Sequence, residues 1–143
     1  MNVATILSEK GTDIVSANPD DSLLDIAKTL RKHRIGCVVL MDGKGAIAGI
    51  VSERDIVRAI ADAGSEVLST PVSRCMTKKV VTCSKSETID AIMAAMTDGR
   101  FRHMPVVEDG ALIGVISIGD VVRLRIAEAE LEAAAMRDYI ATG

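Results

Sequence analysis

One short pattern occurs twice in the chain and decides how the rest is interpreted. "GIVSERDIVR" occupies residues 49–58, and "GVISIGDVVR" occupies residues 114–123, sixty-five positions later. Each copy has a glycine, a serine three residues later and an aspartate three residues after that. A motif that recurs at a fixed distance indicates a duplicated structural unit.

The duplication extends well upstream of the motif. "VSANPDDSLLDIAKTLRKHRI" (residues 15–35) aligns with "VTCSKSETIDAIMAAMTDGRF" (residues 81–101) at an offset of 66, so one residue near Lys44 is extra in the first copy. This alignment predicts four segments along the chain: a first repeat at 7–63, a linker at 64–75, a second repeat at 76–130 and a C-terminal helical tail at 131–143.

Each copy predicts the order strand, helix, strand, strand, helix. The expected first strands are 12–17 and 79–84, the first helices 22–34 and 88–100, the second strands 37–41 and 104–108, and the third strands 46–52 and 111–117. Ser22 and Thr88 lie where they can cap the first helices. The second helices are expected to begin at Asp55 and Asp120. A unit with this order buries only one face of its sheet. We therefore expect an α/β (α+β) fold of two β-α-β-β-α repeats packed with pseudo-twofold symmetry around one core.

The tail continues the last helix. Helical periodicity runs from Asp120 to about Ile140, and the residues expected to line one face are Val121, Leu124, Leu131, Ala135 and Ile140. A helix of about 20 residues is ~30 Å long, which is more than a compact pair of this size needs internally. Its last two turns are therefore expected to pack on another chain.

Composition excludes several classes of function. With a net charge of −3 and a single aromatic pair, Phe101 and Tyr139, the chain is not expected to bind nucleic acid. No apolar run reaches the ~18 residues that span a bilayer, and the N-terminus has no secretory pattern, so we expect a cytoplasmic protein without membrane contact. The cysteines are widely spaced, which predicts no metal site and a structural, buried Cys37.

Gly-x-x-Ser-x-x-Asp at the end of a strand has two interpretations. The start of a helix exposes free N–H groups that suit an anion, the serine hydroxyl can donate to phosphate or ribose, and the carboxylate can accept from two ribose hydroxyls. Ser-x-x-Asp is also an ordinary capping motif that needs no ligand. Its repetition after glycine in two equivalent units favours a shared ligand geometry, although duplication alone could preserve a cap.

The whole pattern resembles a tandem pair of cystathionine-β-synthase (CBS) domains, a Bateman module. The resemblance lies in "GIVSERDI" and "GVISIGDV", and in "RFRHMPVVEDGALIGVIS" at residues 100–117, and it covers about residues 3–128. It implies two clefts between the repeats for adenosine-containing effectors: AMP, ADP, ATP, NAD or S-adenosylmethionine, with Mg²⁺ as a possible companion of ATP and no required cofactor. It also implies a homodimer formed through helices, and a regulated partner protein that the sequence does not identify.

The resemblance assigns roles to particular residues. Asp55 and Asp120 would hold the ribose hydroxyls, and Ser52 and Ser117 would lie near ribose and phosphate. Adenine would lie against two composite linings, made by Thr12, Asp13 and Ile14 with Gly36 and Cys37, and by Lys79 and Val80 with Arg102 and Met104. Each cleft would pair one copy's first strand with the other copy's Ser-x-x-Asp.

The two copies differ at positions that could contact phosphate. Arg102 and His103 in the second copy can supply charge-assisted donors, where the first copy has Gly36 and Cys37. Arg54 could reach a phosphate in the first copy, whereas Gly119 opens the backbone in the second. We expect the cleft with Ser117 and Asp120 to be the better site.

Three functions follow from these residues. A regulatory module that binds an adenosine ligand and passes a change of shape to a partner is the main hypothesis. A dimerisation scaffold with vestigial clefts is the alternative. An enzyme is not expected, because neither signature serine has a neighbouring histidine in the sequence.

Overall fold

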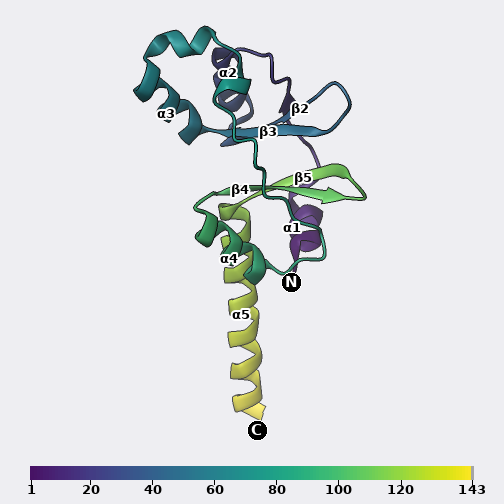
Figure 1. The fold of residues 1–143 in the computed structure, drawn as a ribbon. Coiled ribbons are helices and arrows are strands. Elements are labelled where there is room, and N and C mark those ends of the chain that lie inside the picture. The colour runs from purple at the N-terminus through teal and green to yellow at the C-terminus, as the bar shows by residue number, and fades with distance from the viewer. Residues whose placement is uncertain (143) are drawn as a thin grey trace. The chain divides into compact units, whose positions relative to one another are not determined.

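The computed structural model describes residues 1–142 and divides them into two compact units. Residues 13–81 form the first-repeat unit. Residues 1–12 and the chain from Thr82 onward form the second-repeat unit. Each unit has a small sheet with helices packed against it (Figure 1). The division places the first twelve residues of the chain with the second repeat, not with the first.

The first-repeat unit is built on a three-stranded sheet. Its elements are β1 (Ser16–Ala17), α2 (Leu23–His33), β2 (Cys37–Met41), β3 (Ile47–Ser52) and α3 (Glu53–Ala63). β2 lies in the middle, parallel to β1 and antiparallel to β3. Leu23, Ile26 and Leu30 form one face of α2 and pack on Val38 and other apolar residues of the sheet, all of them buried. The spacing of three and four residues along α2 produces this buried face.

The linker after α3 is structured. It forms two short 3-10 helices, η1 (Ser65–Ser69) and η2 (Val72–Arg74), with Pro71 between them. Proline has no N–H to continue a helix, which separates the two turns. Val72 is fully buried in the core of the first-repeat unit, so this segment belongs to that unit's packing.

The second-repeat unit has a two-stranded sheet and a long last helix. Its elements are α1 (Val3–Lys10), α4 (Ile89–Gly99), β4 (His103–Glu108), β5 (Ala111–Ser117) and α5 (Ile118–Thr142). β4 and β5 are antiparallel. Ile89, Ile92 and Met96 from α4 pack on the strands, and Val121 and Leu124 from α5 join the same core.

The mixed α+β class, both first helices, the paired second and third strands and the long final helix are confirmed. Ser22 and Thr88 cap α2 and α4 as expected, each hydroxyl accepting an amide from the first turn. Cys37 is buried, also as expected.

Three sequence-based expectations were wrong in detail. The first strand at 12–17 is reduced to Ser16–Ala17, and 79–84 forms no strand, only a parallel bridge between Cys83 and Val106. Residues 79–81 belong to the first-repeat unit. The second helices begin at Glu53 and Ile118, two residues before the aspartates, because the serines are the residues that precede the first turn.

The residues predicted to form one face of the tail also differ in their burial. Val121 and Leu124 are buried, whereas Leu131 and Ile140 are 61% and 71% exposed. The first turns of α5 pack on their own unit, and the later turns extend past it (Figure 1).

Helix α1 was not predicted. Asn2 and Thr5 form a capping box at its start, and Val3, Ile6 and Leu7 are buried in the second-repeat core. The Val3 amide donates to the Glu87 carbonyl at 3.0 Å, which fixes the helix to the turn before α4. An eight-residue helix is marginal alone, and tertiary packing of this kind stabilises it.

In the first-repeat unit, the segment that contains Thr77 packs on β3, as α1 packs on the second-repeat unit. Thr77 and Ile50 exchange both backbone hydrogen bonds, at 3.0 and 2.8 Å. In each unit, residues that precede the other repeat's first strand therefore pack on the strand that ends in the signature serine.

The signature glycines permit these close approaches. A methyl group added at Gly49 would lie 2.6 Å from Met76 Sδ and 2.9 Å from the Thr77 carbonyl oxygen. At Gly114 it would lie 2.7 Å from Leu7 Cδ2, the end of a flexible side chain. The glycine of the motif is thus explained by packing, and the two copies differ in how easily the neighbour can move.

Gly49→Ala should destabilise the protein by about 1–3 kcal/mol, because the Thr77 backbone must shift to admit the methyl group. Gly114→Ala should cost less, since Leu7 can change rotamer. Gly43→Ala is the matched control, because an added methyl there meets nothing within 4 Å. Urea unfolding followed by circular dichroism measures the differences. Equal stability of the Gly49 and Gly43 variants would contradict the close approach.

Candidate functional site

Ser52 and Asp55 form a reciprocal cap at the start of α3. The Ser52 amide and hydroxyl donate to Asp55 Oδ2 at 2.9 and 3.2 Å, and the Asp55 amide donates to Ser52 Oγ at 3.4 Å. Two of the free N–H groups in this region are thereby satisfied within the motif.

Ser117 and Asp120 repeat the arrangement at the start of α5. The Ser117 amide donates to Asp120 Oδ2 at 2.9 Å, and the Asp120 amide donates to Ser117 Oγ at 3.2 Å. The capping interpretation of the motif is therefore realised in both copies. It involves only one of the two oxygens of each carboxylate.

The second oxygen of each aspartate faces an arginine of the same motif. Arg58 Nη1 lies 3.8 Å from Asp55 Oδ1, and Arg123 Nη1 lies 3.9 Å from Asp120 Oδ1. Both arginine side chains are at least 70% exposed, so these contacts are weak and easily exchanged. Each carboxylate is itself largely buried, with 12–14% of its side chain exposed. The motif thus presents one carboxylate oxygen that a ligand hydroxyl could take.

The strand beside each serine brings further predicted residues to the same place. Cys37 pairs with Ser52 in the β2–β3 register, and His103 pairs with Ser117 in the β4–β5 register. The first amides of the helices donate to the residues just before these strands: Glu53 to the Gly36 carbonyl at 3.0 Å, and Ile118 to the Arg102 carbonyl at 2.8 Å. The sequence alignment between Gly36-Cys37 and Arg102-His103 is therefore also a structural equivalence.

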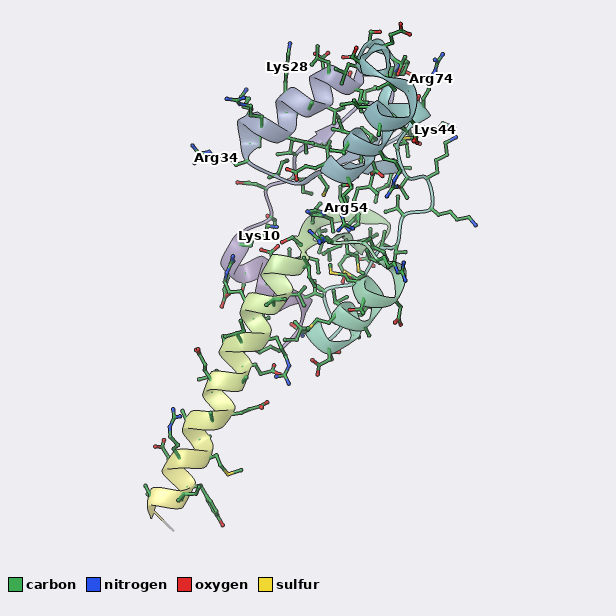
Figure 2. All side chains as sticks on the ribbon, turned by 90° about the vertical axis from the view of Figure 1, so that its left-hand side faces the viewer. Lys10, Lys28, Arg34, Lys44, Arg54 and Arg74 are labelled. Atoms are coloured by element: carbon green, nitrogen blue, oxygen red, sulfur yellow. The ribbon has the colours of Figure 1, made fainter. Side chains whose placement is uncertain are left out.

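One further residue contacts only the second signature. Lys10, at the end of α1, donates to Asp120 Oδ2 at 2.7 Å and to the Val115 carbonyl at 2.9 Å (Figure 2). This contact could not be predicted from local sequence patterns, because 110 residues separate the two side chains.

Lys10 changes the acidity of Asp120. Burial alone would raise the pKa of the Asp120 carboxyl, but the hydrogen bonds from Lys10 and Ser117 and the positive charge of Lys10 outweigh burial. The pKa therefore lies below its ordinary value, and the carboxylate is charged throughout the physiological range.

The first signature has a methionine where the second has this lysine. At the offset of 66 that relates the two copies, Lys10 corresponds to Met76, which packs against Gly49. The two carboxylates therefore differ in their partners: Asp120 has the Lys10 ammonium against it, whereas within residues 1–142 Asp55 forms no ion pair with a lysine.

The residues of the first strands divide between the units. Lys79 and Val80 belong to the unit of Ser52 and Asp55, two residues after Thr77 pairs with β3. Thr12 belongs to the unit of Ser117 and Asp120, two residues after Lys10, whereas Asp13 and Ile14 fall in the first-repeat unit. Each signature thus shares its unit with part of the segment leading into the other repeat.

The remaining predicted residues differ in access. Arg54, Arg102 and Gly119 are exposed. Met104 is 1% exposed and lies in the second-repeat core.

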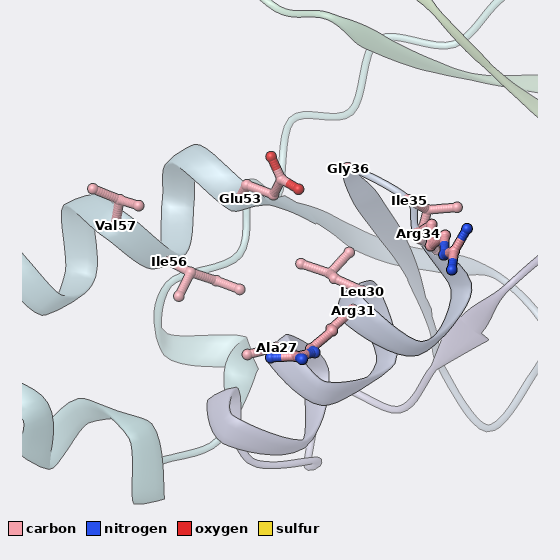
Figure 3. A pocket seen from close by; sticks show the side chains of 9 residues that line it. All are labelled: Ala27, Leu30, Arg31, Arg34, Ile35, Gly36, Glu53, Ile56 and Val57. Carbon is pink, nitrogen blue, oxygen red and sulfur yellow. The ribbon is translucent and has the colours of Figure 1, made fainter.

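A cavity that the sequence did not predict lies between α2 and α3. It has a volume of about 620 Å³, and Figure 3 shows Leu30 of α2 and Ile56 of α3 on facing walls. Arg31 and Arg34 also line it, together with Gly36, which precedes β2, and Glu53 at the start of α3. Among the lining residues only Gly36 was a predicted site residue.

Comparison with known proteins decides the family. Residues 5–62 and 72–127 each match the family model of the CBS domain. The chain belongs to the CBS-domain family. A CBS-domain containing protein from Agrobacterium tumefaciens, known from its crystal structure, is 49% identical, with 87% of this chain and 92% of that one covered and a TM-score of 0.85.

A curated relative is similar over most of this CBS pair. The mitochondrial CBS domain-containing protein CBSX3 of Arabidopsis thaliana is 38% identical over 128 residues, which cover 87% of this chain and 62% of the relative. This chain therefore spans less than two thirds of that protein's length.

Two similar structures contain adenosine compounds. The CBS domain pair of protein MJ0100, solved in complex with 5′-methylthioadenosine and S-adenosyl-L-methionine, is 26% identical, covers 90% of this chain and 98% of that one and has a TM-score of 0.79. A CBS domain protein from Pyrobaculum aerophilum, complexed with AMP, is 26% identical, covers 84% and 89% and has a TM-score of 0.73.

Within residues 1–142, no helix has the length and apolar character that crossing a membrane requires. In the same range, no three His, Cys, Asp or Glu side chains are grouped so that they could hold a metal ion.

Replacing Lys10 by methionine should raise the pKa of Asp120 and lower stability at pH 7. A carboxyl whose pKa is lowered by folding adds stability above its unfolded pKa of about 4, and this stability is lost as pH falls through the folded value. The deficit of Lys10→Met should therefore shrink as the pH falls below about 4. Thermal unfolding between pH 2 and pH 7, with a carboxyl titration by NMR, measures both effects.

Lys44→Met is the control for this measurement, since Lys44 takes part in no ion pair among residues 1–142. A Lys10 variant that matches this control at every pH would show that the contact contributes nothing to folding.

Proposed function

We propose that the protein is a regulatory module that binds an adenosine-containing ligand at its two Ser-x-x-Asp signatures. The candidates are AMP, ADP, ATP, NAD and S-adenosylmethionine, with Mg²⁺ as a possible companion of ATP. The observation that carries the proposal is the geometry of the two aspartates, each of which uses one oxygen for the cap and directs the other only at a distant, exposed arginine. Similar CBS pairs in complex with AMP and S-adenosylmethionine support it.

The ribose is assigned to the second oxygen of Asp55 or Asp120. Adjacent ribose hydroxyls are donors that a buried, charged carboxylate accepts well. The weak arginine contact is exchanged for the ligand, and the cap that holds the helix start in place is kept. Ser52 and Ser117 keep their hydroxyls at the same helix starts, where free N–H groups favour a phosphate.

The copies are assigned different preferences. Lys10 supplies an ammonium beside Asp120, and Arg102 and His103 lie at the start of the neighbouring strand. This set suits a ligand that carries phosphate. Asp55 has no lysine ion pair among residues 1–142, and Arg54 and Lys79 are exposed cations of its unit. The Asp120 site is therefore proposed as the tighter one for nucleotides.

The adenine contacts and the segment boundaries remain proposals on the same basis. We assign two sets of residues to the base: Thr12, Asp13, Ile14, Gly36 and Cys37 on one side, and Lys79, Val80, Arg102 and Met104 on the other. We retain repeats at 7–63 and 76–130, a linker at 64–75 and a tail at 131–143. The module is proposed to be cytoplasmic, homodimeric and without catalytic activity, and to act on a separate regulated protein.

The capping box favours a second function. A motif that caps a helix needs no ligand, so a dimerisation scaffold with vestigial clefts would retain the same hydrogen bonds. The two functions differ in one measurable property, which is stabilisation by ligand.

Ligand binding should raise the temperature of unfolding. A ligand at about 100 times its dissociation constant adds roughly 2.7 kcal/mol, which is a shift of several degrees for a protein of this size. Each candidate is added at millimolar concentration, and unfolding is followed by circular dichroism because the chain has no tryptophan.

Asp55→Asn and Asp120→Asn identify the working site. Asparagine keeps an oxygen for the serine amide, so the cap survives, but it loses the charge that ribose hydroxyls favour. Loss of the shift in Asp120→Asn alone would assign nucleotide binding to the second signature. If no ligand stabilises the wild type, the scaffold is correct and the proposed sensing function is wrong.

A further inference from the structure

Helix α5 is much longer than its contact with its own unit. It runs from Ile118 to Thr142, about 37 Å at 1.5 Å per residue, and its buried residues are Val121 and Leu124 in the first two turns. From Ala129 onward all of its side chains are exposed except for the half-buried Ala134. Figure 1 shows this part of the helix extending beyond α1 and α4, and Figure 2 shows side chains on all of its sides.

An unbroken apolar stripe follows the exposed side of α5. Its members are spaced by four and three residues in strict alternation and are all exposed: Val122, Ile126, Ala129, Ala133, Met136 and Ile140. We call these six residues the α5 stripe. The alternation is the a/d pattern of a coiled-coil seam, and the stripe spans between two and three heptads.

The stripe faces away from the core of the second-repeat unit. Val121 and Leu124 are buried in the core of the unit, and Glu128 forms an ion pair with the N-terminal amine at 3.2 Å. In heptad terms these three residues are at c and f, on the side of the helix nearly opposite to a and d. Arg125, at a g position beside the stripe, also reaches Asp90 of α4 at 3.4 Å. A second helix can therefore lie along the stripe without displacing anything from the core.

The charges beside the stripe indicate which partner fits. Arg125 and Glu132 occupy g positions, whereas Glu130 and Arg137 occupy e positions. In a parallel, in-register pair each g residue faces the e residue five positions later on the other helix. Arg125 then faces Glu130, and Glu132 faces Arg137, so that each pair of opposite charges occurs twice by symmetry.

The antiparallel alternative is disfavoured by the same residues. With the stripe in full overlap, two antiparallel copies bring Glu130 near Glu130 and Glu132 near Glu132, which repel. Within residues 1–142 neither Glu132 nor Arg137 has an ion-pair partner, whereas Arg125 already contacts Asp90 and Glu128. The Glu132–Arg137 pair is thus the more available one.

We propose that α5 pairs with α5 of a second copy as a parallel two-stranded coiled coil through the α5 stripe. Ala129 and Ala133 in its middle let the two helices approach closely, and the larger residues at its ends bury apolar surface. The pairing gives a location and a direction to the homodimer of the proposed function. It does not rest on ligand binding.

Charge reversal tests the pairing. Glu132→Arg places two arginines opposite each other twice, and we expect the dimer dissociation constant from sedimentation equilibrium to rise by about tenfold. The double variant Glu132→Arg with Arg137→Glu restores opposite charges and should return to within about threefold of wild type. Asp138→Arg changes the same charge away from the seam and is the matched control. Circular dichroism confirms that each variant is folded.

A cysteine at the end of the stripe tests the direction. In the parallel pair Ile140→Cys meets its own copy, so it should form a disulfide-linked dimer under mild oxidation, whereas the antiparallel pair would place it near Val122. Wild type is the control for Cys37, Cys75 and Cys83.

An unchanged dissociation constant in Glu132→Arg, or a double variant as weak as the single one, would overturn the proposal. A dimer that survives both would show that another surface holds it. All of these measurements are made without nucleotide, so their failure is distinct from failure of the ligand to stabilise the protein.

Discussion

A single carboxylate oxygen orients the start of the signature helix in each unit. Oδ2 of Asp55 or Asp120 accepts the backbone amide of the serine three residues earlier, and the serine hydroxyl accepts the aspartate amide in return. This exchange fixes the point at which a buried strand becomes a helix. It holds the carboxylate in one orientation, with little of its surface exposed. The second oxygen has a defined direction only because the first is held, so the cap and the proposed ribose contact are two uses of one group.

The same constraint explains why the duplicated sites need not be equivalent. Both caps have the same hydrogen bonds, yet the chain that packs on each strand differs. Lys10 contacts Asp120 and keeps its pKa low, while Met76 occupies the equivalent position near Gly49. Duplication preserved the geometry of the helix start, which depends on residues three apart. The electrostatics of each copy depend on a side chain from a distant segment, and that side chain differs between the two copies.

Sequence alone was sufficient for features that depend on neighbouring residues. The caps at Ser22 and Thr88, the apolar faces of α2 and α4, and the paired strands that end at Ser52 and Ser117 all follow from local patterns. Helix α1 did not follow, because Val3 and Ile6 become a face only when the second repeat lies against them. The Lys10–Asp120 contact could not be predicted either, because it too depends on the packing of segments that are distant in the sequence. The prediction of the first strands failed because their few backbone partners depend on where the chain passes from one unit to the other.

The tail shows that a periodic pattern does not by itself decide which surface of a helix is buried. Val121 and Leu124 belong to one side of α5, and Val122 and Ile126 to the other; both sides are apolar at helical spacing. The sequence does not state which side faces its own unit, and burial in the structure separates them. Asp120 and Val122 are two residues apart on one continuous helix, so a proposed ligand contact and a proposed subunit contact share a rigid element. If a ligand binds the paired and unpaired forms with different affinity, pairing must change the ligand affinity by the same factor. A change at the helix start would then be transmitted along α5 to the other chain, and no other element would have to move.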